Sequence, residues 1–153
     1  MFDISSQEEK IAAIKELSES SNMRLFINAR TDLFWLNAGD SSTRLREAVK
    51  RAKAYQDAGA DCIFIPGLTD RKSIKKIREE VSCPINLLVD PEMPSISELS
   101  EIGIERLSCG SGPFRATLTY LRSIGEEIVN NQTFHQMTNG DVLSYRRLTE
   151  FIQ

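Results

Sequence analysis

Arg30 is the residue of this sequence best suited to binding an acidic small molecule. It stands in the stretch Asn28-Ala29-Arg30-Thr31-Asp32, directly after an apolar, β-rich run. The planar guanidinium group of arginine can hold a carboxylate or a phosphonate through two parallel hydrogen bonds. A local ion pair between Arg30 and Asp32 is the alternative interpretation. The surrounding motif favours ligand binding, with Thr31 and Asp32 orienting the loop.

A glycine-rich turn, Gly110-Ser111-Gly112-Pro113, supplies a second candidate. It joins a β-rich run to the start of a predicted helix, where free N–H groups and the helix dipole favour an anion. Tight packing is the other explanation of its glycines, and Ser108 shares this ambiguity. Asn86 could hydrogen-bond a ligand from inside the fold or could satisfy a backbone group. The candidate substrate-binding residues are therefore Arg30, Asn86, Ser108 and Gly110.

No metal site and no catalytic residue can be assigned from the sequence. His135 is the only histidine, and we interpret it as part of a solvated linker between two predicted helices. Cys62, Cys83 and Cys109 form no C-x-x-C pair, and their odd number argues against a disulfide framework. We expect them to be reduced and mostly buried. Residues 33–36 form an apolar patch for which we expect core packing, with a lid or an interface as the alternative.

The composition is that of an ordinary globular chain. Of its 153 residues, 41% are hydrophobic and 27% are charged. No apolar run approaches the roughly 18 residues of a membrane span. The net charge is −3 and the basic residues are scattered, so we expect neither nucleic acid nor a membrane as a partner. The N-terminus lacks the pattern of a secretory signal, and we therefore expect a cytoplasmic protein that binds a small molecule.

Short β-rich runs alternate with helical patterns along the chain. The runs are Arg24–Asn28, Cys62–Ile65, Ile85–Val89 and Ile104–Ser108. The helical patterns are centred on Ile11–Leu17, Leu45–Ala52, Ile74–Val81, Ser95–Gly103, Pro113–Ile128 and Asp141–Phe151. We expect the first helix to start at a capping box formed by Ser5-Ser6-Gln7-Glu8.

This order predicts an α/β fold in which helical crossovers make all the strands parallel. The short units, in which Gly59 and Gly103 lead directly into strands, favour a barrel over a doubly wound sheet. A (β/α)8 barrel usually needs about 250 residues. We therefore predict the second half of a TIM-type (β/α)8 barrel, with four parallel strands and outer helices. We expect a single domain over 1–153, with the half-barrel at about 5–130 and a C-terminal helical extension at about 131–153.

Three segments resemble the isocitrate lyase and phosphoenolpyruvate mutase superfamily. They are Ile27–Asp32, Ala58–Gly67 and Arg106–Ala116, and the likeness extends from about residue 7 to residue 128. It is closest to the members described as phosphoenolpyruvate mutase or carboxyphosphonoenolpyruvate phosphonomutase-like. The resemblance implies an enzyme that makes or breaks C–C or P–C bonds beside a carboxylate, through an enolate held on Mg²⁺. Its substrate would be a small 2-oxo or 2-hydroxy carboxylic acid or a phosphonate.

The resemblance covers only the C-terminal half of such an enzyme. In the family, the acidic residues that hold Mg²⁺ lie on earlier strands, with a Gly-Tyr-Gly-like loop and, in the lyases, a Lys-Lys-Cys-Gly-His stretch. None of these segments has a counterpart here. Pro66 stands where methylisocitrate lyases have a glutamate and the mutases a histidine, and Leu88 stands where the lyases have an asparagine. We therefore expect no metal ligands in this chain.

Two functions remain open at this point. In the first, the chain supplies the substrate-binding half of an enzyme of this type, and the metal site comes from elsewhere. In the second, it is a non-catalytic, truncated half-barrel that self-associates. Strand edges near Leu25 and Leu107 would be unpaired in a half-barrel, and the strand faces that fill a closed barrel would be exposed. We therefore expect a homo-oligomer or a complex with a complementary N-terminal half.

Overall fold

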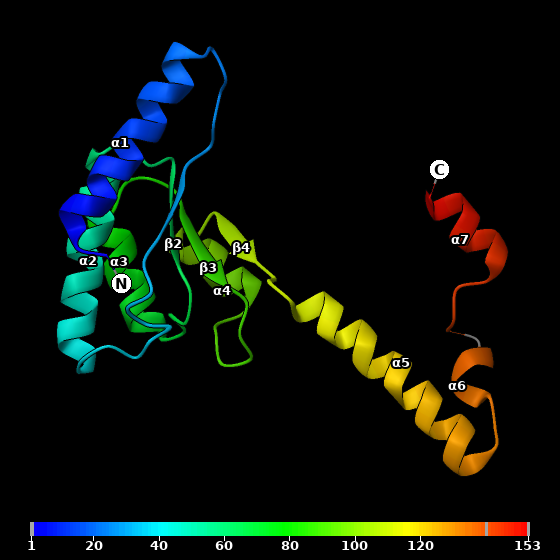
Figure 1. Cartoon of the computed structure of the whole chain (residues 1–153). Helices are drawn as coiled ribbons and strands as arrows, with labels where there is room; N and C mark the ends of the chain where they lie inside the picture. Colours follow the sequence, from blue (N-terminus) through cyan, green and yellow to red (C-terminus); the bar gives the residue numbers. More distant parts are fainter. Residues whose placement is uncertain (1, 140, 153) are drawn as a thin grey trace. The chain divides into compact units, whose positions relative to one another are not determined.

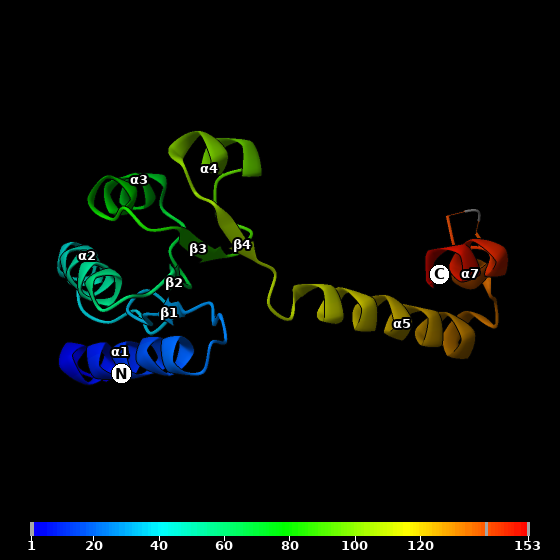
Figure 2. The same cartoon turned by 90° about the horizontal axis from the view of Figure 1, so that it is seen from above.

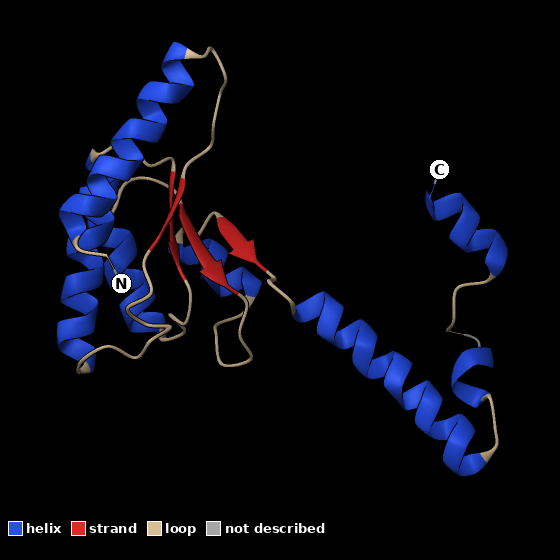
Figure 3. Cartoon of the chain, viewed as in Figure 1, coloured by secondary structure: helices blue, strands red, loops and turns tan. Residues whose placement is uncertain are grey.

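The computed structural model describes residues 2–139 and 141–152, which form two compact units. The first unit ends at Gly110 and contains the strands, and the second begins at Ser111 and is helical (Figure 1, Figure 3). Among the described helices, none combines the length and the apolar character that crossing a membrane requires. The organisation of 1–153 as a single domain stays a prediction.

The first unit alternates helices with the strands of one parallel sheet. Its elements are α1 (Ile4–Ser20), β1 (Asn28–Arg30), α2 (Ser41–Asp57), β2 (Cys62–Ile65), α3 (Arg71–Glu80), β3 (Ile85–Leu88), α4 (Ile96–Ile102) and β4 (Arg106–Ser108). The strands lie in the order β1-β2-β3-β4, and each neighbouring pair is parallel. The predicted architecture of four parallel strands with helices is confirmed.

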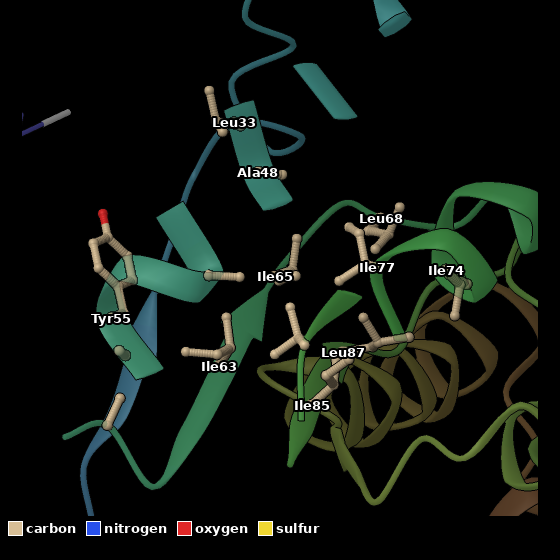
Figure 4. Close-up of a cluster of buried hydrophobic side chains, with 14 of the residues drawn as sticks. Leu33, Ala48, Tyr55, Ile63, Ile65, Leu68, Ile74, Ile77, Ile85 and Leu87 are labelled. Atoms are coloured by element: carbon tan, nitrogen blue, oxygen red, sulfur yellow. The ribbon is translucent and has the colours of Figure 1, made fainter. Parts of the chain in front are cut away.

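The helices cover one face of this sheet. Figure 2 shows α1 to α4 in a row along one side of the strands. Successive side chains of a strand point to opposite faces, so every second residue of β2 and β3 faces these helices. Those residues are Ile63, Ile65, Ile85 and Leu87, and all of them are buried. They form the core with Ile74 and Ile77 of α3, Tyr55 and Ala48 of α2, and the loop residues Leu33 and Leu68 (Figure 4).

Side-chain caps fix where the helices of the first unit begin. Asp3, Asp40, Asp70 and Ser95 are the N-caps of α1, α2, α3 and α4, and each accepts a hydrogen bond from a backbone N–H of the first turn. The hydroxyl of Ser42 also donates to Asp40 at 2.6 Å, and the hydrogen bonds from Ser42 and Thr43 hold the pKa of the Asp40 carboxyl well below the usual range. The predicted capping box of α4 is confirmed by the reciprocal bonds between Ser95 and Glu98.

The predicted start of the first helix is wrong. The N-cap is Asp3 rather than Ser5, because the Asp3 carboxylate accepts the backbone N–H of Ser6 at 2.7 Å. The hydroxyl of Ser5 also donates to Asp3, at 3.0 Å. A carboxylate is a stronger acceptor than a hydroxyl and is favoured by the helix dipole, so the helix begins at Ile4.

The first strand lies later in the chain than predicted. We expected Arg24–Asn28, whereas β1 covers Asn28–Arg30. A strand needs a partner, and the partner strand begins at Cys62, which pairs with Asn28. The backbone before Ile27 has no such partner, and the N–H of Leu25 bonds instead to the hydroxyl of Ser18 at 3.1 Å. The other three runs became strands with ends within two residues of those predicted.

The second unit consists of α5 (Gly112–Asn131), α6 (His135–Thr138) and α7 (Tyr145–Ile152). The interpretation of His135 as linker is wrong, because it is the first residue of α6. The Glu127 carboxylate of α5 accepts the N–H groups of His135 and Gln136 at 2.8 and 2.9 Å and the hydroxyl of Thr133. These donors hold the pKa of Glu127 below its ordinary value. The last helix starts at Tyr145 rather than at Asp141.

The packing of the helices against the sheet can be tested at Ile77 of α3. Replacing the fully buried Ile77 by alanine should lower the free energy of unfolding by about 2–5 kcal/mol, because it leaves a cavity beneath the sheet. Ile96→Ala, at a position that is 75% exposed, should change it by less than about 0.5 kcal/mol. Urea titrations followed by circular dichroism measure both changes. Equal losses for the two variants would contradict this packing.

Candidate functional site

The uncovered face of the sheet carries the polar strand residues. We call it the inner face, and its residues are Asn28, Arg30, Cys62, Phe64, Asn86, Leu88, Arg106 and Ser108. They alternate along the strands with the residues that face α1 to α4. Within this face, one register row joins the four strands and contains Arg30, Phe64, Asn86 and Arg106.

Arg30 lies at the carboxyl end of the sheet, as the last residue of β1 rather than just after it. Its Nε donates to Oδ1 of Asp32 at 2.6 Å, so the local ion pair considered above is present. The guanidinium carbon lies 5.5 Å from the centre of the Phe64 ring. No described residue accepts a hydrogen bond from the terminal nitrogens of Arg30. Asp32 therefore orients the guanidinium group and leaves its far edge available to a ligand.

Asn86 and Ser108 form one hydrogen-bonded unit on neighbouring strands. The Nδ2 of Asn86 donates to the hydroxyl of Ser108 at 3.0 Å, and that hydroxyl is also 3.1 Å from Oδ1. Asn86 is fully buried, whereas Ser108 is half-buried. Neither explanation offered above for Asn86 anticipated this pairing. The buried amide fixes the position of the Ser108 hydroxyl at the end of β4.

A hollow of about 630 Å³ opens over the carboxyl end of the inner face. The residues that line it are Arg30, Trp35, Phe64, Leu88, Arg106, Leu107, Ser108, Cys109 and Gly110. The structure thus brings together three predicted site residues, Arg30, Ser108 and Gly110. Asn86 reaches this place only through Ser108, and Thr31 and Asp32 are not part of the lining.

Trp35 and Arg106 line the hollow and were missed. The expectation of core packing for residues 33–36 is correct for Leu33, which is buried, and wrong for Trp35 and Leu36, which are 57% and 58% exposed. No periodic pattern of apolar residues could have separated these positions. Arg106 could have been found from the alternation of its strand, because it lies two residues before Ser108 and so faces the same side.

Gly67 places Trp35 at the hollow. It has a φ of +79°, and a Cβ atom added to it would lie only 2.9 Å from the backbone nitrogen of Trp35. Such an approach is closer than a side chain tolerates, and the positive φ independently favours glycine. The backbone of Phe34 and Trp35 can therefore lie directly against the loop that follows β2.

Burial and the charge of Arg106 act in opposite directions on the pKa of the Cys62 thiol, which lies on the inner face. Burial raises the pKa of the Cys62 thiol to about 11, and the positive charge of Arg106 opposes that rise. Cys62 is therefore neutral near pH 7. The guanidinium carbon of Arg106 lies 5.8 Å from the centre of the Phe26 ring, which precedes β1. Arg106 thus extends from β4 across the face toward the opposite edge of the sheet.

The described residues do not offer a metal site. No three of their histidine, cysteine, aspartate and glutamate side chains come together as ligands. Mg²⁺ prefers carboxylate and water oxygens, and the hollow is instead lined by two arginines. Two carboxylates close to it along the chain are already paired, Glu105 with Arg78 and Asp32 with Arg30. The residues present on this face therefore suit an anion and do not fit Mg²⁺.

The chain is similar to known proteins in three ways: to a family model, to curated protein sequences and to solved structures. A sequence model of the family described as phosphoenolpyruvate phosphomutase matches residues 1–129. A protein of Mycobacterium tuberculosis H37Rv, itself uncharacterised, is 38% identical over 109 residues, which cover 71% of this chain and 39% of that protein. The oxaloacetate decarboxylase of Pseudomonas fluorescens SBW25 is 30% identical over 119 residues, which cover 76% of this chain and 39% of that enzyme.

The solved structures extend the similarity to the fold. A protein of Burkholderia cenocepacia J2315 superposes with a TM-score of 0.76 at 31% identity, covering 83% of this chain and 52% of that one. The structural neighbours are TIM-type barrels, and this chain covers about half of each. The prediction of half a (β/α)8 barrel is confirmed. The chain spans less than half the length of the curated relatives it matches.

The contact between Gly67 and Trp35 can be tested with the only tryptophan in the chain. Gly67→Ala should lower the free energy of unfolding by more than about 1 kcal/mol, because alanine disfavours the positive φ and meets the Trp35 backbone. It should also shift the tryptophan emission, since Trp35 must move. Gly125→Ala, in α5 and with nothing near the added Cβ, is the matched control. It should leave the tryptophan emission unchanged and should not lower the free energy of unfolding, because alanine is favoured over glycine in a helix interior by about 0.5–1 kcal/mol. An unaltered emission spectrum in Gly67→Ala would refute this role.

Proposed function

Because this chain belongs to the phosphoenolpyruvate phosphomutase family, we propose that it is the substrate-binding half of an enzyme of the isocitrate lyase and phosphoenolpyruvate mutase type. The expected membership of that superfamily is confirmed by the family model, which matches residues 1–129. The proposed substrate is a small 2-oxo or 2-hydroxy carboxylic acid or a phosphonate. The observation that carries this proposal is the free edge of Arg30, which opens on a hollow that contains no described carboxylate.

Each candidate residue has a separate task in this proposal. Arg30 binds the carboxylate of the acid through its terminal nitrogens, because Asp32 already holds Nε. The Ser108 hydroxyl, fixed by Asn86, bonds an oxygen of the same ligand. Gly110 has a φ of +55°, and a Cβ atom added to it would lie 3.1 Å from Cδ1 of Leu88, so glycine leaves room for Leu88 beside the turn. Thr31 follows Arg30, is 1% exposed, and donates its backbone N–H to the carbonyl of Phe64 at 3.0 Å, which ties the start of the loop to β2.

The proposed reaction class is the cleavage or rearrangement of a C–C or P–C bond beside a carboxylate. In this class, bound Mg²⁺ supplies stabilisation of an enolate. The described residues do not fit Mg²⁺, so we assign to them the binding and orientation of the acid and no step of bond cleavage. The metal ligands belong to a complementary N-terminal half, which is the partner we propose. A cytoplasmic location is part of the same proposal, supported by three free thiols.

Self-association without catalysis is the alternative function. The edges of β1 and β4 have no partner among the described strands, and the inner face is open, which both favour a covering copy. Face-to-face pairing of two copies would bring Arg30 and Arg106 of one against the same arginines of the other. This repulsion favours a partner with a negatively charged surface over a second copy on the inner face. Two copies could still pair through their strand edges or through the second unit.

Acid binding at Arg30 is the direct test of this proposal. The chain should bind oxalate weakly in calorimetric titration. Arg30→Lys should weaken that binding by up to about fivefold, because lysine keeps the charge and loses the planar fork, and the site is open to solvent. Lys75→Ala, which also changes a basic residue but on α3, should leave the affinity unchanged. Equal affinities of the original chain and Arg30→Lys would remove Arg30 from the site.

Turnover should depend on a second component. We expect no cleavage of 2-oxo or 2-hydroxy diacids by this chain alone with Mg²⁺, because no described residue holds the metal. Activity should appear when a complementary half that carries acidic metal ligands is supplied. An assay for released pyruvate or glyoxylate, with and without that half, measures this. Robust activity of the chain alone would contradict our placement of the metal ligands.

A further inference from the structure

Arg106 is a charged residue on the sheet for which the proposed function has no task. The strands contain two arginines, Arg30 and Arg106, and both lie on the inner face in the same register row. Arg30 is paired with Asp32 at 2.6 Å. Among the described residues, no carboxylate forms an ion pair with Arg106. The inner face therefore keeps one positive charge that the first unit does not neutralise.

The position of this charge is held by an aromatic contact. The guanidinium group of Arg106 lies over the ring of Phe26 at 5.8 Å, and its charge acts on Cys62 at the start of β2. A cation–π contact uses the charge of arginine and the face of the ring. It leaves the N–H groups of the guanidinium available as hydrogen-bond donors. The contact with Phe26 therefore orients Arg106 over the inner face without using its N–H donors.

Arg30 and Arg106 approach the same hollow from opposite edges of the sheet. Both line it, with Phe64 and Leu88 as the apolar floor between them. Three strand spacings of about 4.8 Å place their backbones about 14 Å apart. Both side chains lean over the face between them, since the Arg30 guanidinium lies over Phe64 of β2 and that of Arg106 lies near the Phe26 ring, on the amino side of β1. A small acid with a negative charge at each end can bridge two cations placed in this way.

We propose that Arg106 is a second anion-binding residue of this hollow and makes it select acids with two negative charges over acids with one. This inference rests on the proposed function, since it requires an acid beside Arg30. It goes beyond the proposed function, because the binding of one carboxylate by Arg30 requires neither Arg106 nor a preference for acids with two charges. Phe26 acts through Arg106 and is a positioning residue.

Succinate and butyrate test this selectivity, because they share a four-carbon chain and differ in one carboxylate. In calorimetric titrations, the original chain should bind succinate at least about fivefold more tightly than butyrate. Arg106→Gln should bring the two affinities within about twofold of each other by weakening succinate alone. Arg106→Lys, which restores the charge, should recover part of the preference. Phe26→Leu should reduce it without changing butyrate binding.

Arg46→Gln is the matched control, since Arg46 is an exposed arginine of α2 outside the hollow and its loss changes the net charge equally. It should keep the preference for succinate, and far-ultraviolet circular dichroism should show that each variant is folded. A preference that survives in Arg106→Gln, or is absent from the original chain while both acids bind, overturns this inference alone. Failure of both acids to bind the original chain overturns the proposed function and this inference with it.

Discussion

The alternation of side chains along four short parallel strands is the constraint on which this structure depends. Ile63, Ile65, Ile85 and Leu87 point to one face and must be buried, so α1 to α4 pack there. The residues between them are thereby forced onto the other face, where Arg30, Asn86 and Arg106 share one row. Hydrophobic burial on one side thus fixes the position of the polar groups on the other. The register of the sheet thus places the two arginines, and the loops that follow β1 and β4 add Trp35, Cys109 and Gly110 to the lining.

Arg30 shows how a structural contact and a binding role can coexist. The ion pair with Asp32 was the simple alternative to ligand binding, and it is present at 2.6 Å. It uses Nε, whereas a carboxylate can still be held by the two terminal nitrogens. The ion pair therefore orients the guanidinium group and partly neutralises its charge. Arg106 has no such carboxylate among the described residues, which is why the two arginines differ in what they can bind.

Much of this fold was visible in the sequence, because the apolar runs and the helical spacing are local patterns. The site was visible only in part. Arg30 and Ser108 stood out by residue type and motif, but the pairing of Asn86 with Ser108 depends on the register of β3 and β4, which no local pattern specifies. The same holds for β1, whose start is set by pairing with Cys62. Trp35 was assigned to the core because apolar character alone cannot distinguish it from Leu33.

Our central claim is that the hollow at the carboxyl end of the inner face is an acid-binding half-site, and Cys109 offers the most direct test. This exposed thiol lines the hollow, whereas Cys83 is half-buried and lies outside it. The measurement is the rate of alkylation of each cysteine by iodoacetamide, followed by peptide mass spectrometry, at increasing oxalate concentration. We predict that oxalate slows the alkylation of Cys109 in a saturable manner and leaves that of Cys83 unchanged. Equal rates for Cys109 with and without oxalate would contradict the claim.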